Sequence, residues 1–316
     1  MKISNLLKHL GIFVTDYREF SFSFALAHFT LNVSFLPWRT RQKFHERAIL
    51  TYLDRSFGHC FKQKALETET EKHESSKYVW VLWWQGEAQM PSIVAHCYAA
   101  LKQNLPKDRN LILLDKDNYH SYIELPEYIL TKSSAGKISI THLSDIIRFL
   151  LLEKFGGLWI DATVLTTPVP DGFFESDFFT LYAPGLFPCF IFNGKWSSFL
   201  FYFRQPHHPF CKKMNVFFAT YWRQQNFLID YLLIDYAIYL ILKNNDSFKS
   251  LFQKLPINRD YYWLNTHLNS KITREEYTYH LNRSLFHKLS YKIPRKSSGD
   301  EKNGWDFIFE NSHNRE

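Results

Sequence analysis

The clearest pattern of apolar and polar positions in this chain lies between residues 142 and 163. Its apolar residues recur at helical spacing, at Ile146, Ile147, Leu150 and Leu151. This spacing predicts a helix over 142–155, with Ser144 able to cap its start. Gly156 and Gly157 then let the chain leave the helix with a positive φ, and residues 158–160 are typical of a short buried strand.

Runs at strand spacing and at helix spacing alternate along residues 77–296. We predict strands at 78–84, 110–114 and 158–160, with shorter β runs near 178–182 and 189–193. We predict helices at 91–104, 142–155, 210–225 and 228–244. Such alternation favours a mainly parallel sheet flanked by helices, so the expected fold class is α/β.

The two ends of the chain differ from this central region. Residues 1–57 have a helical pattern, and residues 67–76 form a charged, serine-containing stretch with little to bury. Residues from 297 onward are polar. We therefore expect a helical extension and linker at 1–76, one domain at 77–296 and a disordered tail at 297–316.

Residues 20–38 contain no acidic or basic side chain and end just after Pro37. Their serines, His28 and Asn32 make insertion across a membrane unfavourable, so we expect a helix or loop that packs on the domain or lies on a membrane surface. Four basic residues follow, at Arg39, Arg41, Lys43 and Arg47. They suit either an anionic membrane surface or an ordinary solvated helix face.

Three charged residues accompany the central pattern. Asp145 and Arg148 share one helix face at spacing i, i+3, and Asp161 follows the predicted strand directly. An open α/β sheet binds its ligand beyond the carboxyl ends of its strands, where Asp161 would lie. Without a ligand site, the first two would form a surface ion pair and Asp161 would cap the next turn.

The pattern Ser144-Asp145-x-x-Arg148, then Gly156-Gly157, then a hydrophobic strand ending Asp161-Ala162-Thr163, resembles sugar transferases with S-D-x-x-R, G-G and D-x-D motifs. It is most similar to the capsular polysaccharide synthesis protein family, related to α-mannosyltransferases and glucosylating toxins. Other stretches agree in the same order, at 80–87, 92–94, 125–129, 193–197, 228–231 and 287–292. The resemblance implies a GT-A type fold, a nucleotide-diphosphate sugar donor and retention of the anomeric configuration.

The resemblance also implies roles for individual residues. Asp161, Asp145 and Arg148 would be catalytic, with Asp161 near a metal and the other two holding hydroxyls of the donor sugar. Donor binding would fall to Trp83, Trp84, Ser144, Thr163, Asn193, Trp196, Lys288 and Lys292. Trp83 and Trp84 are adjacent on a strand and point to opposite faces, so only one of them would stack on the base. Asp230 and Asp235 are candidates for acceptor binding.

Thr163 departs from the D-x-D pattern, because many relatives have there a second aspartate that binds Mn²⁺ or Mg²⁺. A hydroxyl is a poor substitute for a carboxylate on a hard divalent cation. Two solutions follow. Asp161, His287 and the diphosphate would hold the metal weakly, which is our expectation, or lysines such as Lys288 and Lys292 would neutralise the phosphates instead.

Composition indicates the class of partner in outline. A hydrophobic content of 46% argues against disorder, and a net charge of +7 suits anionic partners such as nucleotide sugars or an anionic lipid surface. No dense Lys/Arg block, RNP-like aromatic motif or zinc spacing is present, so we expect no nucleic acid. Four widely separated cysteines are typical of a reduced, cytoplasmic protein.

The sequence therefore predicts a retaining glycosyltransferase that moves a hexose from a nucleotide-diphosphate sugar to a growing capsular or other surface polysaccharide. The acceptor would be lipid-linked, and the enzyme cytoplasmic or peripheral at the inner face of the cell membrane. The alternative is a noncatalytic sugar-nucleotide or glycan binding protein that lost turnover with the second carboxylate. A membrane-anchored scaffold would leave Asp145, Arg148 and Asp161 unexplained.

Overall fold

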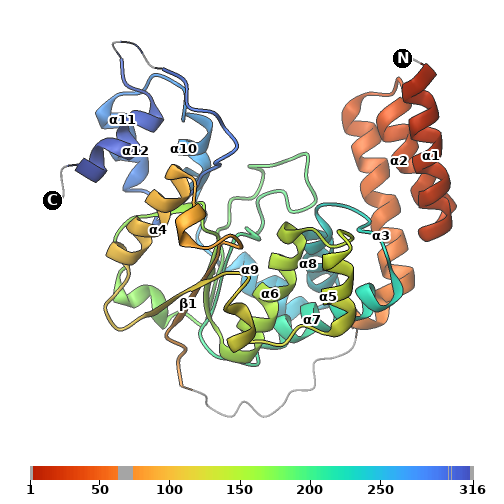
Figure 1. The fold of residues 1–316 in the computed structure, drawn as a ribbon, viewed down its shortest axis with the longest axis horizontal. Helices are drawn as coiled ribbons and strands as arrows, with labels where there is room; N and C mark the ends of the chain where they lie inside the picture. Colours follow the sequence, from red (N-terminus) through yellow and green to blue (C-terminus); the bar gives the residue numbers. More distant parts are fainter. Residues whose placement is uncertain (1–2, 63–73, 298, 300, 314–316) are drawn as a thin grey trace.

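The computed structural model describes residues 3–62, 74–297, 299 and 301–313 (Figure 1). Its main sheet has the strand order β2-β1-β3-β6-β5. The strands are β1 (Tyr78–Leu82), β2 (Asn110–Leu114), β3 (Gly157–Ile160), β5 (Phe178–Phe179) and β6 (Leu200–Phe203). β1 is parallel to both β2 and β3, and β6 is antiparallel to both β3 and β5. The expected α/β fold with a mainly parallel sheet is confirmed.

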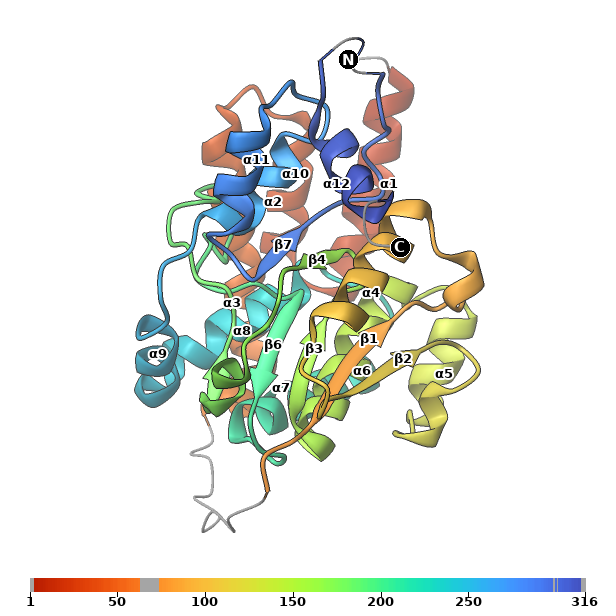
Figure 2. The same cartoon turned by 90° about the vertical axis from the view of Figure 1, so that its left-hand side faces the viewer.

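Helices cover both faces of this sheet, as predicted (Figures 1 and 2). Alternate strand residues point to opposite sides, so Trp80 and Trp159 enter one core while Val79 and Leu158 enter the other. The first core is closed by α5 (Glu127–Ser134), α6 (Ile140–Phe155), α7 (Pro209–Gln224), α8 (Leu233–Asn244) and α9 (Asp246–Gln253). The second is closed by α4 (Ser92–Asn104), α10 (Trp263–Thr266), α11 (Arg274–Leu281), α12 (Gly304–His313) and a small sheet of β4 (Val164–Thr166) and β7 (Phe286–Lys288).

Short 3₁₀ turns connect several of these elements. They are η1 (Glu87–Gln89), η2 (Tyr119–Ser121), η3 (Asp171–Glu175) and η4 (Asp260–Tyr262). The small sheet matters most for the site, because β4 follows β3 directly and pairs antiparallel with β7. This pairing brings a segment from the end of the domain back to the carboxyl end of β3.

Three helices form the N-terminal extension: α1 (Ile3–Glu19), α2 (Phe22–Val33) and α3 (Trp38–Lys62). α3 packs against α7 and α8, and α2 packs against both α1 and α3. The uncharged segment 20–38 thus contains a helix capped by Ser21, whose Phe24, Ala25 and Ala27 are buried. Within the part of the chain that the structure describes, no helix is both long and apolar enough to cross a membrane.

Several predicted boundaries were wrong. α6 begins at Ile140, where the hydroxyl of Ser139 accepts from the amide of His142, so Ser144 lies inside the helix and does not cap it. α8 begins at Leu233 rather than 228. Residues 67–73 of the expected linker lie outside the described residues. The segment expected to be a disordered tail contains α12. Its sequence is mostly polar, but Trp305, Phe307 and Ile308 are buried and hold the helix on the domain.

The β run expected at 189–193 is also wrong, because this segment is a turn. Asn193 and Gly194 both have positive φ, 44° and 72°, and a Cβ at Gly194 would lie 2.1 Å from the carbonyl oxygen of Ala183. The amide of Ala183 donates to the carbonyl of Gly194 at 2.6 Å, which closes the turn. The strand comes later, at β6, whose residues are all buried and therefore show no alternation.

Candidate active site

Asp161 lies at the carboxyl end of β3, the central strand of the main sheet. Gly156 and Gly157 have φ of 66° and 91°, and a Cβ at Gly157 would lie 2.3 Å from the carbonyl oxygen of Tyr78. Glycine therefore lets the chain turn out of α6 and pair closely with β1. The amide of Asp161 donates to Phe199 at 2.9 Å, and this places its carboxylate where the predicted site was expected.

Three donors surround the Asp161 carboxylate. Arg148 Nη2 lies 3.2 Å and Trp159 Nε1 3.1 Å from Oδ1, while Lys288 Nζ lies 3.1 Å from Oδ2. Burial opposes the negative charge, but the positive charges of Lys288 and Arg148 outweigh it and lower the pKa of Asp161. Asp161 is therefore ionised near neutral pH, with 28% of its side chain still exposed.

Arg148 is held between two carboxylates, and only 4% of its side chain is exposed. Its Nη1 lies 3.2 Å from Asp145 Oδ1, and its guanidinium lies 5.0 Å from the centre of the Trp159 ring. His142 supports Asp145 from the other side, with Nδ1 3.4 Å from Oδ2. The indole of Trp222 donates to His142 Nε2 at 2.9 Å, so the imidazole proton is assigned to Nδ1, facing Asp145.

Lys288 reaches the site from β7. The β4–β7 register pairs Val164 with Lys288, and its ammonium donates to the hydroxyl of Thr163 at 2.7 Å as well as to Asp161. It also lies 4.8 Å from the centre of the Phe199 ring. The lysine thus bridges the two polar residues of the Asp-Ala-Thr sequence.

These contacts do not fit the expected metal site. Both oxygens of Asp161 and the hydroxyl of Thr163 already accept from cationic or neutral donors. His287 was expected to be a ligand, but its Nε2 donates to the carbonyls of Leu281 and Ser284, at 3.1 and 3.0 Å. Neighbouring strand residues point to opposite sides, so with Lys288 on Asp161, His287 points away. Burial lowers the pKa of His287 and keeps it neutral.

The rest of the described structure agrees with this geometry. Among residues 3–62, 74–297, 299 and 301–313, no three His, Cys, Asp or Glu side chains are grouped so that they could hold a metal ion. The metal ligand set expected from the sequence is therefore not assembled around Asp161.

Comparison with known proteins now identifies the family. The sequence profile of the capsular polysaccharide synthesis protein family matches residues 33–303, most of the chain. The chain belongs to this family. It is also similar to an O-glycosyltransferase, braB, of Annulohypoxylon truncatum, with 31% identity over 96 residues. That match covers 28% of this chain and 23% of the fungal protein, so the chain spans less than a quarter of that relative. No solved structure gives a significant match.

The two tryptophans expected to bind the donor follow β1 rather than lying on it, because the strand ends at Leu82, and their side chains pack on opposite cores. Trp83 packs on the second core, donates to the carbonyl of Gln89 at 3.3 Å and meets Tyr291 edge-on, with ring centres 5.6 Å apart. Trp84 packs on the first core and stacks on Tyr119. Because β1 and β3 are parallel, Trp83 lies at the same sheet edge as Asp161.

Lys292 and Ser144 are less closely tied to the centre of the site. Lys292 is exposed, and its ammonium lies 6.0 Å from the centre of the Tyr291 ring. Its neighbour in the chain, Tyr291, is the residue that contacts Trp83. Ser144 is half-buried in α6, one residue before Asp145.

Trp196 and Asp235 were assigned to different substrates, but they bind each other. The Trp196 indole donates to Asp235 Oδ1 at 2.7 Å, and only 1% and 3% of the two residues are exposed. Trp196 therefore does not line an open pocket. Burial raises the pKa of Asp235 to about 7; the Trp196 hydrogen bond opposes this rise and the Asp145 carboxylate adds to it.

Asn193 and Asp230, also predicted to bind substrates, have local roles in the fold. Asn193 supplies the positive φ of the turn described above, and its buried Oδ1 accepts no hydrogen bond within the described chain. Asp230 Oδ1 accepts from the amide of Leu232 at 2.8 Å, and Oδ2 lies 3.9 Å from His45 Nδ1 of α3. Burial raises the pKa of Asp230. This aspartate joins the start of α8 to the N-terminal helices.

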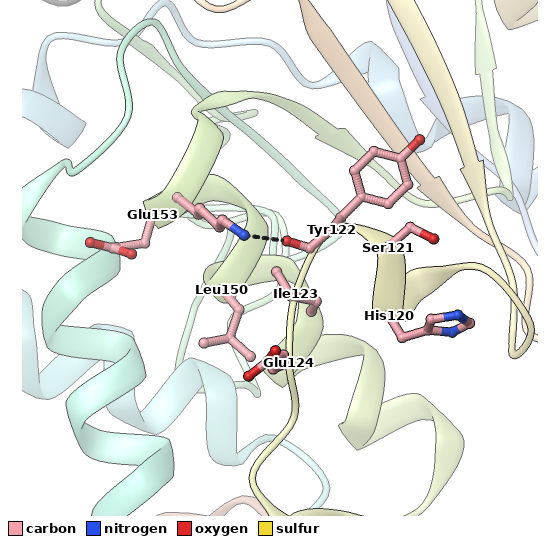
Figure 3. A pocket seen from close by; sticks show the side chains of 8 residues that line it. His120, Ser121, Tyr122, Ile123, Glu124, Leu150 and Glu153 are labelled. Carbon is pink, nitrogen blue, oxygen red and sulfur yellow. Dashed lines mark hydrogen bonds between the residues drawn. The ribbon is translucent and has the colours of Figure 1, made fainter.

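A surface pocket lies elsewhere on the protein (Figure 3). Its volume is about 390 Å³, and its lining comes from residues 120–124 and from Leu150, Glu153 and Lys154 near the end of α6. No residue predicted for the site lines it. The amino-acid pattern did not single out His142, Trp159 and Trp222, because nothing local in the sequence shows that Trp159 contacts Asp161, that His142 contacts Asp145 or that Trp222 contacts His142.

Proposed function

We propose that this protein is a retaining glycosyltransferase of GT-A type that moves a hexose from a nucleotide-diphosphate sugar to a growing capsular or other surface polysaccharide. Membership of the capsular polysaccharide synthesis protein family and the similarity to an O-glycosyltransferase support glycosyl transfer. The observation that carries the proposal is the Asp161 carboxylate, held between Arg148 and Lys288 at the carboxyl edge of the central strand.

The reaction breaks the bond between the anomeric carbon and the diphosphate, which leaves with the electron pair. A hydroxyl oxygen of the acceptor forms the new bond and passes its proton to the departing diphosphate. Negative charge grows on the departing phosphate, so a fixed positive charge lowers the barrier. Lys288, with 20% of its side chain exposed, is suited to this role.

Arg148 and Asp161 are suited to orienting the donor. A fixed guanidinium and an ionised carboxylate offer donors and acceptors to sugar hydroxyls without reorganising, and correct orientation supplies much of the rate in such reactions. Asp145 and His142 act through Arg148, because they hold its guanidinium in place. Trp83 and Lys292 are proposed to contact the base and the phosphates at the same edge.

Of the two ways to neutralise the diphosphate, the contacts favour lysine over a weakly held Mn²⁺ or Mg²⁺. Lys288 already bridges Asp161 and Thr163, the positions from which a metal would be bound. The threonine hydroxyl, a poor metal ligand, is an ordinary acceptor for an ammonium group.

The decisive experiment incubates the purified protein with a panel of nucleotide sugars and measures both thermal stabilisation and release of nucleoside diphosphate. We expect one donor to stabilise the protein and to be turned over. Asp161→Asn should abolish turnover, whereas Asp177→Asn, an exposed ion-paired aspartate before β5, should not. Stabilisation without release in the presence of acceptor lipid extract would instead establish the binding protein, and no stabilisation by any donor would overturn both.

A further inference from the structure

The outer surface of α1 and α2 carries a stripe of large apolar side chains. On α1 they lie at Leu7, Leu10, Val14 and Tyr17, a spacing of three and four residues that places them on one helix face. Phe22 and Leu26 continue the stripe on α2, and the Tyr17 and Phe22 rings meet edge-on with centres 6.2 Å apart. Between 38% and 62% of each of these residues is exposed.

The loop between α2 and α3 extends this apolar surface at one end of the molecule. Phe35 is fully exposed, and about half of Leu36 and of Trp38 is exposed (54% and 48%). Figure 1 shows this loop at the same end of the helical extension as the start of α1, because α1 and α2 run in opposite directions. We call the stripe and the loop together the apolar face of the extension.

The exposed charges of the extension are of one sign. In residues 5–62, the exposed side chains of Asp, Glu, Lys and Arg are all basic: Lys8, Arg18, Arg39, Lys43, Arg47, Arg55 and Lys62. The acidic residues of the same helices are buried or half-buried. Asp16 lies 2.8 Å from His28, and Asp54 lies 3.1 Å from Lys62. The extension therefore presents apolar and positive groups to its surroundings without exposed negative ones.

We propose that α1, α2 and the α2–α3 loop dock this protein on an anionic membrane surface. The apolar face would enter the headgroup region, and the basic side chains would meet lipid phosphates, as in interfacial amphipathic helices. Charge complementarity decides the occupant. A second copy of this chain would bring two sets of positive charges together, which repel each other. A phosphate backbone would pair with the basic side chains but would leave the apolar stripe exposed to water.

Sedimentation with vesicles tests this docking. The full chain should bind vesicles of phosphatidylcholine mixed with phosphatidylglycerol, bind phosphatidylcholine alone far more weakly, and lose affinity as salt is added. Phe35→Ser with Leu36→Ser should weaken binding about tenfold. The control is Ile257→Ser, which removes a side chain that is 63% exposed outside the extension and should leave binding unchanged.

A second pair of variants tests the charge. Arg39→Gln with Lys43→Gln should lower affinity about fivefold for each charge removed, whereas Lys249→Gln with Lys254→Gln on and after α9 should not. No binding to anionic vesicles, or equal loss in the control variants, overturns the proposal. Self-association in solution that disappears with Phe35→Ser and Leu36→Ser also overturns it, because the face would then cover a second copy. The assay contains no donor, so its result is independent of the proposed activity.

Discussion

The ammonium of Lys288 lies 3.1 Å from the carboxylate of Asp161, although 127 residues separate them in the chain. About a fifth of the lysine side chain and a quarter of the aspartate side chain remain exposed, at 20% and 28%. The pair is therefore open to a ligand but is fixed by the strands that carry it. Any diphosphate that approaches Asp161 would meet this ammonium.

Lys288→Met should reduce glycosyl transfer about 10²-fold or more with the fold intact, because it removes the fixed positive charge beside the departing phosphate. Lys288→Arg should retain more activity than the methionine variant. Initial rates at saturating donor measure the effect. Lys102→Gln, which changes an exposed lysine paired with Glu87, is the matched control and should be neutral. Wild-type rates in Lys288→Met would remove the lysine from the mechanism.

Excess chelator should leave transfer close to its rate in Mn²⁺, because Lys288 occupies the acceptors that a metal would need. The free protein should bind Mn²⁺ only weakly. Calorimetric titration of Mn²⁺ with and without nucleoside diphosphate measures this directly. Loss of activity in chelator, or tight Mn²⁺ binding to the free protein, would show that the lysine moves aside for a metal.

Asp161→Asn should lower transfer about 10²-fold or more, since the amide keeps the size of the carboxylate but loses its charge. Its neutral side chain also no longer balances Arg148 and Lys288. Circular dichroism and the transfer rate measure fold and function separately. Asp177→Asn is the control and should transfer at the wild-type rate. Near wild-type turnover in Asp161→Asn would show that Asp161 only caps the turn after β3.

Arg148→Lys should lose transfer while nucleoside diphosphate still binds. A guanidinium contacts Asp145 through one nitrogen and Asp161 through another, and an ammonium on a flexible stem does not reproduce this planar fork. Transfer kinetics and diphosphate binding by calorimetry separate the two effects. The control is Arg204→Lys, which changes an exposed arginine that pairs with Asp177. Equal loss of transfer and of diphosphate binding would mean that Arg148 has only a structural role, in its ion pair with Asp145.

The central motif was predictable because its signals are local. The helix spacing, the two glycines and the following strand determine where Asp145, Arg148 and Asp161 lie, and all three meet in the structure. Contacts across the sequence were not predictable in the same way. Whether His287 or Lys288 faces Asp161 depends on the β4–β7 register, and the sequence of a three-residue strand does not determine that register.

Trp196 and Asp235 illustrate the same limit for the periphery of the site. Thirty-nine residues separate them, and each taken alone resembles a binding residue. Only the packing of the 196 segment on the first turn of α8 shows that the indole and the carboxylate satisfy each other. The prediction of a disordered tail differs from the structure for a related reason. The buried aromatic residues of α12 are few and lie among polar ones, so the sequence there is polar on average.

The Asp235–Trp196 pair also predicts how stability depends on pH. The folded-state pKa of Asp235 is about 7, above its ordinary value of 3.8, so the folded state holds this proton more tightly than the unfolded chain. Below about pH 3 both states are protonated, so the group does not change the free energy of unfolding. As pH rises towards 7 the unfolded state ionises first, so this group progressively lowers the free energy of unfolding, and the loss is complete above pH 7.

Asp235→Asn should remove this dependence, because the amide oxygen still accepts from Trp196 and carries no charge. At pH 8 the variant should be more stable than the wild type by up to about 4 kcal/mol, and near pH 3 the two should be alike. Urea unfolding across this range measures the difference, and Asp177→Asn, whose side chain is exposed, should follow the wild-type profile. A variant that is less stable than the wild type at pH 8 would show that folding lowers the pKa of Asp235 rather than raising it, so that the positive charge of Arg148 outweighs burial.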